Sequence, residues 1–259
     1  MRDPSFGTHP DVPDPRDRQF VIPRRFKKGL PRRVDLRERQ QTPPIFNQLP
    51  LNSCSANAIA AAIAFDELRV RPATAVTPSR LFIYYNERAA EGLLMCNRPV
   101  SLRDGYRSVF TKGVCPERMW PYRPAEFDRK PTPRCFRAAH GLRVSGFLRI
   151  RRELRDLKAC LADGFPFTFG GTYFKSFKSR RVARTGMIPM PRRSEPQLGG
   201  HAMLAIGYDD REEVFILQNS FGGKWGLKGY CLIKYDYIMH PNLSWDFWTV
   251  RRLSRSKSV

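Results

Sequence analysis

One cysteine stands where it could act as a nucleophile. Cys54 lies at the start of an alanine-rich, apolar stretch over residues 53–68 that is typical of a buried helix. A thiol in the first turn of a helix faces unpaired backbone N–H groups and the positive end of the helix dipole. Both favour the thiolate, which is the form that attacks a carbonyl. Taken alone, such a cysteine is more often an inert core residue, because free cysteine is among the most buried residue types.

Two segments far downstream carry groups that could work with this thiol. The first is Gly199-Gly200-His201, which opens a predicted strand, and the second is the glycine- and aromatic-rich run NSFGGKWGLKGY over residues 219–230. His201 follows Cys54 by 147 residues, and Asn219 follows it by 165. A lone histidine at a strand start is usually structural, so these residues gain meaning only from their combination.

The combination resembles the papain-like cysteine peptidases, in which histidine and asparagine follow the cysteine at separations of about 130–150 residues. The resemblance runs from about Leu30 to Arg252, and within the family it favours the bacterial-type branch without a long pro-segment. LPRRVDLR (30–37) is similar to the family's mature start, and the run from Asn219 is similar to its NSWGxxWGxxGY block. Gln48 precedes Cys54 by six residues, the spacing of the family's oxyanion-hole glutamine.

The resemblance implies a role for each of these four residues. Cys54 is expected to be the nucleophile, and His201 the general acid and base. Asn219 is expected to orient the imidazole through its side-chain oxygen. The Gln48 amide and the Cys54 backbone N–H are expected to stabilise the tetrahedral oxyanion. The same resemblance implies a polypeptide substrate, no metal and no cofactor.

Two further residues are expected to line the substrate cleft. Trp225 is a candidate wall on the leaving-group side, with plain packing as the alternative, and Gly200 precedes the histidine where the family places an acidic or small residue. Phe221 stands where the family has a tryptophan that shields the His–Asn pair. A phenyl ring can exclude water there but lacks the indole N–H.

The segment around the nucleophile departs from the family's CGSCW pattern. Leu51 replaces a cysteine that forms a disulfide in secreted members, and Ser55 replaces the aromatic residue after the nucleophile. Residues 99–106 (PVSLRDGY) lie where secreted members have a Gly-Gly segment that pairs with the substrate backbone, and they contain no equivalent of it. Substrate preference is therefore not predicted.

The charge of the chain points to a second kind of partner. The 259 residues include 46 Lys and Arg against 24 Asp and Glu, for a net charge of +22 and a sequence pI near 10.4. Basic residues concentrate near residues 24–33, 175–194 and 251–259. Such charge favours nucleic acid or another polyanion, an anionic surface or an acidic protein as a partner.

Two alternatives to an active peptidase follow from these features. One is a catalytically idle papain-like protein that serves as a basic binding or structural component for nucleic acid or another polyanion. The other is acyl transfer or transglutaminase-like chemistry, against which the NSFGGKWG sequence (219–226) counts.

The pattern of elements predicts an α+β chain with the papain-like two-lobe fold. Helices are expected over residues 53–68, 77–92 and 101–113, in a helical lobe of about residues 44–140. The second lobe, about residues 141–252, is expected to be an antiparallel, β-barrel-like body with one helix over residues 152–164, and the cleft lies between the lobes. Its strands are expected at 165–173, 201–208, 213–219, 229–235 and 246–252.

The two ends are expected to lie outside this peptidase domain of residues 34–252. Residues 1–33 form a Pro- and Arg-rich extension, which we expect either to cover the cleft or to tether the protein to an anionic partner, and residues 253–259 form a basic tail. The first twenty residues hold no apolar segment of a cleavable signal peptide. With six cysteines dilute in the chain, a reducing compartment such as the cytoplasm is expected, with non-classical export left open. The longest apolar run, Ala58–Phe65, is too short to span a membrane.

Overall fold

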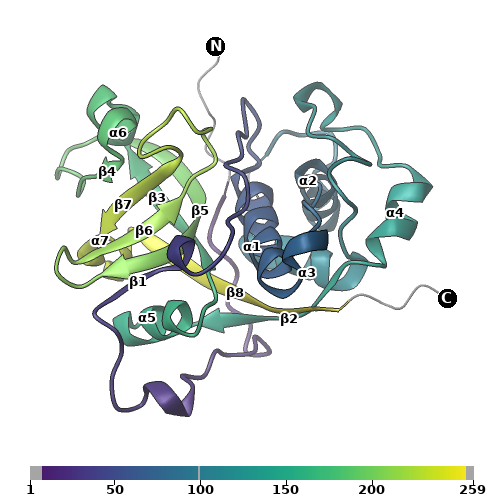
Figure 1. Cartoon of the computed structure of the whole chain (residues 1–259). Helices are drawn as coiled ribbons and strands as arrows, with labels where there is room; N and C mark the ends of the chain where they lie inside the picture. The colour runs from purple at the N-terminus through teal and green to yellow at the C-terminus, as the bar shows by residue number, and fades with distance from the viewer. Residues whose placement is uncertain (1–7, 99, 255–259) are drawn as a thin grey trace.

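Helices and a sheet occupy two lobes that lie side by side (Figure 1). The structure is a computed structural model that describes residues 8–98 and 100–254. The helical lobe contains α1 (Cys54–Val70), α2 (Arg80–Ala90), α3 (Leu102–Lys112) and α4 (Pro133–Ala139). Three shorter helices accompany the sheet, namely α5 (Leu154–Ala162), α6 (Arg180–Thr185) and α7 (Tyr235–Met239).

Local sequence signals fix two of the helix starts. Ser101 is the N-cap of α3, where its hydroxyl accepts from the Asp104 N–H, and Gly113 ends the helix at φ +75°, as the capping pattern predicts. The start of α2 differs from the prediction, because the Ser79 hydroxyl accepts from the Phe82 N–H. This cap places the first helical residue at Arg80, three residues after the predicted cap at Thr77.

The strands form one mixed sheet. They are β1 (Arg33–Asp35), β2 (Arg143–Ile150), β3 (Phe167–Phe174), β4 (Met187–Ile188), β5 (Gln197–Asp209), β6 (Val214–Gln218), β7 (Tyr230–Lys234) and β8 (Ser244–Ser254). The order is β2-β8-β3-β5-β6-β7-β4, with β1 paired to β5. All pairs are antiparallel except β4 with β7.

The expected β-barrel-like lobe is wrong in one respect, because the sheet is open. β2 and β4 are the two ends of the strand order, and within the described residues each pairs with a single neighbouring strand, while β2 also forms an isolated bridge to Gln19. The physical reason is the direction of β8, which carries β2 beneath the helical lobe, where β2 packs against α3 (Figure 1). A strand held there cannot return to close the sheet on β4.

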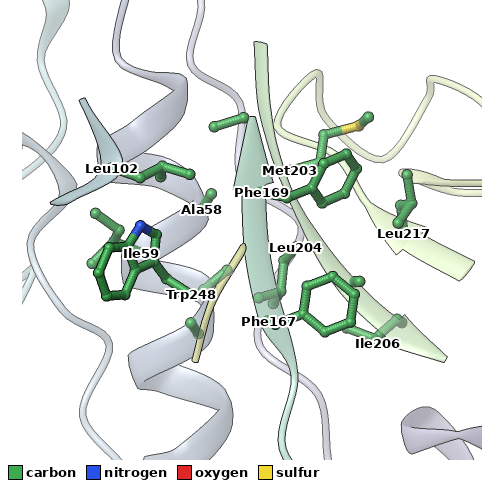
Figure 2. Packing of buried hydrophobic residues seen from close by; sticks show 14 of the residues in the cluster. Ala58, Ile59, Leu102, Phe167, Phe169, Met203, Leu204, Ile206, Leu217 and Trp248 are labelled. Atoms are coloured by element: carbon green, nitrogen blue, oxygen red, sulfur yellow. The ribbon is translucent and has the colours of Figure 1, made fainter. Parts of the chain in front are cut away.

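A continuous apolar core joins the two lobes. Trp248 of β8 is fully buried, and Figure 2 shows its indole beside α1, near Ile59 and Leu102, with Phe167 and Phe169 on the other side of the view. Alanines such as Ala58 give α1 little side-chain bulk, so this helix packs directly against β5. The packing brings the first residue of α1 to the strand that contains His201. The labelled core residues are Ala58, Ile59, Leu102, Phe167, Phe169, Met203, Leu204, Ile206, Leu217 and Trp248.

The described part of the N-terminal extension, residues 8–32, lies against the two lobes. Phe20 is buried, and its N–H donates to the Arg149 carbonyl of β2 at 2.7 Å. Asp11 is also buried, where its carboxylate accepts from the Trp248 indole N–H at 2.8 Å and from the Arg103 N–H at 3.0 Å. Residues 1–7 of the extension and 255–259 of the tail lie outside the described residues. No helix among the described residues has the length and apolar character that crossing a membrane requires.

Candidate active site

The residues expected to do chemistry come from three segments that meet between the lobes. Cys54 is the first residue of α1, His201 lies in β5, and Asn219 directly follows β6. Gln48 lies in the loop before α1. All four are buried, and Cys54, His201 and Gln48 expose none of their surface.

The hydrogen bonds of Asn219 determine which nitrogen of His201 carries the proton. Asn219 Oδ1 accepts from the Ser220 backbone N–H at 2.8 Å, which identifies this atom as the amide oxygen. His201 Nε2 lies 2.8 Å from the same oxygen and must therefore be the donor. In the neutral ring the lone pair is then on Nδ1. The Asn219 backbone is itself fixed by a bond from its N–H to the Gly229 carbonyl at 3.0 Å.

Gln48 and Ser220 connect the segment before the thiol to the segment after the asparagine. The Gln48 N–H donates to the Ser220 carbonyl at 2.9 Å, and the Ser220 hydroxyl donates to Gln48 Oε1 at 2.7 Å. The other end of the Gln48 amide donates from Nε2 to the Leu51 carbonyl at 3.0 Å. These bonds fix both the position and the rotation of the amide beside the start of α1.

Tyr122 supports the same loop, and the sequence analysis did not identify it. Its hydroxyl donates to the Gln48 carbonyl at 2.7 Å and therefore accepts from the Ser53 hydroxyl, 2.6 Å away. Burial raises the pKa of the Tyr122 phenol to about 12, so this group remains a neutral donor. The Arg80 guanidinium lies over the tyrosine ring at 4.1 Å.

Aromatic rings enclose the imidazole. The Phe221 ring is centred 4.9 Å from that of His201, and the rings of Tyr173 and Phe177 lie 5.7 and 5.9 Å away. Trp225 packs on Phe177 at 5.5 Å and on Phe221 at 5.6 Å, so it forms an outer layer of this cluster. Tyr173 and Phe177 were not identified from the sequence, because no local pattern distinguishes them from core residues.

The place of the missing aromatic residue after the nucleophile is taken by a polar pair. The Ser55 hydroxyl donates to the Glu87 carboxylate at 2.7 Å inside the helical lobe. Burial raises the pKa of Glu87 to about 8, because a carboxylate without water around it is costly.

The first described residues pass over the predicted cleft. Thr8 Oγ1 donates to the Val100 carbonyl at 2.9 Å. On the other lobe, a Cβ added to Gly200 would lie 2.0 Å from the Thr8 carbonyl oxygen, so only glycine permits this approach. Residues 8–12, here called the covering segment, therefore connect Gly200 with the loop before α3. Residues 99–106, which lacked a Gly-Gly equivalent, contribute Val100 and Arg103 to the contact.

Burial has an electrostatic consequence for His201. Loss of hydration lowers the pKa of its imidazole to about 4, and the hydrogen bond to Asn219 offsets only part of that effect. The ring is therefore neutral at pH 7 in this covered conformation.

All six cysteines have free thiols, and no group of His, Cys, Asp and Glu suited to a metal ion occurs among residues 8–98 and 100–254.

Comparisons with known proteins agree with this fold and geometry. The family described as papain family cysteine protease matches residues 30–243. An uncharacterized peptidase C1-like protein of Acanthamoeba polyphaga mimivirus is 36% identical over 231 residues, which cover 85% of this chain and 74% of that protein. The crystal structure of xylellain, a cysteine protease from Xylella fastidiosa, superposes with a TM-score of 0.88 at 34% identity, covering 97% of this chain and 98% of that one.

A procathepsin B from Trypanosoma congolense shares the fold at a TM-score of 0.76 and 16% identity, covering 95% of this chain and 86% of that one. The chain belongs to the papain family of cysteine proteases, and it is a cysteine peptidase. The likeness to xylellain is consistent with the bacterial-type branch.

The Tyr122 network generates a testable prediction. Tyr122→Phe removes the donor to the Gln48 carbonyl and the acceptor of the Ser53 hydroxyl. We expect kcat to fall about tenfold with KM nearly unchanged, because a misplaced oxyanion donor affects the transition state more than binding. Peptide turnover measures this split. Tyr85→Phe is the matched control, because Tyr85 is a buried tyrosine of α2 outside this network. Equal effects of both substitutions, or a change confined to KM, would contradict the positioning role.

Proposed function

We propose that the chain hydrolyses peptide bonds with Cys54 as the nucleophile, His201 as the acid and base, and Asn219 as the group that orients the imidazole. The Gln48 amide and the Cys54 backbone N–H act as the oxyanion donors. The observation that carries this proposal is the 2.8 Å bond from His201 Nε2 to Asn219 Oδ1. With Nε2 committed to the asparagine, Nδ1 is the nitrogen that exchanges protons with the thiol and the substrate.

Each step follows from this assignment. Nδ1 takes the Cys54 proton, the thiolate attacks the scissile carbonyl, and the resulting oxyanion is stabilised by the two donors. Nδ1–H then protonates the leaving amine, which breaks the C–N bond and leaves a thioester. A water molecule gives its proton to Nδ1 and attacks the thioester, and the thiol leaves with that proton.

The residue assignments are tested by turnover of a fluorogenic peptide and by labelling with a thiol-directed peptidyl probe. Cys54→Ala is expected to abolish labelling and to lower turnover at least about a thousandfold. Gln48→Ala is expected to lower kcat by about 10²–10³. Cys96→Ala, at an exposed cysteine, is the control and should change neither readout. Labelling that persists in Cys54→Ala would mean that another thiol is the nucleophile.

The proposal extends to the covering segment. Its contacts with Gly200 and Val100, together with the complete burial of Cys54 and His201, support a resting conformation in which the peptidase is closed by its own N-terminal residues. The same burial favours the second candidate, a catalytically idle papain-like protein that binds a polyanion through its basic stretches. The two candidates differ in what happens when the segment is removed.

A chain that begins at Pro13 separates them. In the proposed closed conformation the covering segment keeps water away from His201, so its removal should raise the pKa of the imidazole from about 4 towards 6.5. The imidazolium then persists to higher pH, where it can stabilise the Cys54 thiolate. We expect peptide turnover to increase at least about tenfold. An NMR titration of the histidine and the turnover assay measure both effects.

Asp14→Asn in the full chain is the control, because Asp14 pairs with Arg16 and Arg107 and lies outside the covering segment. Equal turnover of the full and shortened chains would contradict closure. The absence of turnover in both would favour the idle protein.

A further inference from the structure

A large basic cavity lies beside the candidate active site. Its volume is about 840 Å³, and it is lined by η5 (Lys175–Lys178), α6, β4 and the loop that leads into β5. Figure 1 shows α6 and β4 at the end of the sheet away from the helical lobe. Most of its lining belongs to residues 175–194, one of the basic stretches expected to bind nucleic acid, an anionic surface or an acidic protein, and Glu195, Pro196 and Leu198 complete it.

Cations dominate the polar lining of this cavity, here called the basic cavity. Lys175, Lys178, Arg181 and Arg192 all line it, against one carboxylate, that of Glu195. The oxygens of Glu195 accept from the backbone N–H groups of Ser176 and Arg192, so this carboxylate serves to fix the loop. Among the described residues, no carboxylate forms an ion pair with Lys175, Arg181 or Arg192.

The floor of the cavity is apolar. Val182 is buried, Met190 is exposed, and both line the cavity with Leu198. A ligand that fits must combine negative charge with some apolar surface and must be long enough to reach several cations. A polypeptide segment with acidic side chains satisfies these conditions.

The cavity is connected to the imidazole by a single residue. Phe177 stands between the lining residues Ser176 and Lys178, and its ring contacts both His201 at 5.9 Å and Trp225 at 5.5 Å. Leu198, at the other end of the lining, precedes His201 by three residues in β5.

The covering segment lies on the other side of β5. It meets Gly200 next to Trp245 of β8, whereas Trp225 follows β6. In the sheet, β3 and β8 flank one side of β5, and β6, β7 and β4 flank the other. None of residues 8–12 is among the residues that line the basic cavity.

We propose that the basic cavity binds the part of the substrate that follows the scissile bond and selects acidic residues there. This proposal rests on the proposed peptidase function. The leaving amine takes its proton from His201, so the chain attached to that amine passes the Phe177 and Trp225 wall as it leaves the thiol. Acidic side chains two or more residues beyond the scissile bond then reach Lys175, Arg181 and Arg192.

The test uses quenched fluorescent peptides with one common acyl half, followed by a glutamate-rich, serine-rich or lysine-rich half. At low salt we expect kcat/KM for the glutamate-rich peptide to exceed that of the lysine-rich peptide about tenfold, mainly through KM. The difference should shrink as salt is raised. Lys175→Glu with Arg181→Glu should remove or invert this order.

The control is Arg134→Glu with Arg137→Glu, which makes the same change of net charge at two exposed arginines of α4. A small peptidyl-aminocoumarin substrate, which has no residues after the scissile bond, should be hydrolysed equally by both double variants. Failure of both the full chain and the chain that begins at Pro13 to hydrolyse any substrate would contradict the peptidase proposal itself. Normal hydrolysis without an acidic preference, or a preference located before the scissile bond, would overturn only the role of the cavity.

A competing ligand class is tested in the same assay with single-stranded DNA. If DNA binds with an affinity that Lys175→Glu with Arg181→Glu removes, and the peptides show no charge order, the cavity is a nucleic-acid site and the substrate proposal is wrong. If DNA inhibits the unchanged chain and both double variants equally, DNA binds elsewhere on the basic surface. The order of kcat/KM for the glutamate-rich and lysine-rich peptides then decides the proposal.

Discussion

The site depends on a small set of hydrogen bonds between segments that lie far apart in the chain. Gln48 and Ser220 exchange two bonds, of 2.9 and 2.7 Å, and the Gly222 N–H donates to the Phe46 carbonyl at 2.9 Å. These contacts hold the loop before Cys54 against the loop after Asn219. Because a buried polar group without its partner is costly, each loop is stable in this form only when the other is present. The positions of the imidazole and of the Gln48 amide are thus set by one shared network.

The burial of this network has an electrostatic consequence for the imidazole. Exclusion of water strengthens the bond between His201 and Asn219 but also lowers the pKa of the imidazole to about 4. An imidazole that is neutral cannot hold a thiolate as an ion pair.

Local sequence signals predicted α3 with both of its caps and the buried α1, because those elements are defined by residues a few positions apart. The roles of Gln48, Cys54, His201 and Asn219 came from the family resemblance, and the structure places His201 Nε2 2.8 Å from Asn219 Oδ1. The open sheet was not predicted, because strand order depends on where β2 and β8 meet the helical lobe. Tyr122 and Phe177 were missed for a similar reason. Their roles arise from partners up to 74 residues away, which no local pattern encodes.

We propose that His201 activates Cys54 when the covering segment is removed, and the pH dependence of Cys54 alkylation measures this activation. The measurement uses iodoacetamide and mass spectrometry in a Cys96→Ala background. For the chain that begins at Pro13, we expect rapid alkylation of Cys54 at about pH 6, well below the ordinary cysteine pKa of about 8.5. This acidic reactivity should be lost in His201→Ala, and the full chain should react slowly at the same pH. If the alkylation rate rises with pH as for an ordinary thiol, and does so equally in His201→Ala, then His201 does not activate Cys54.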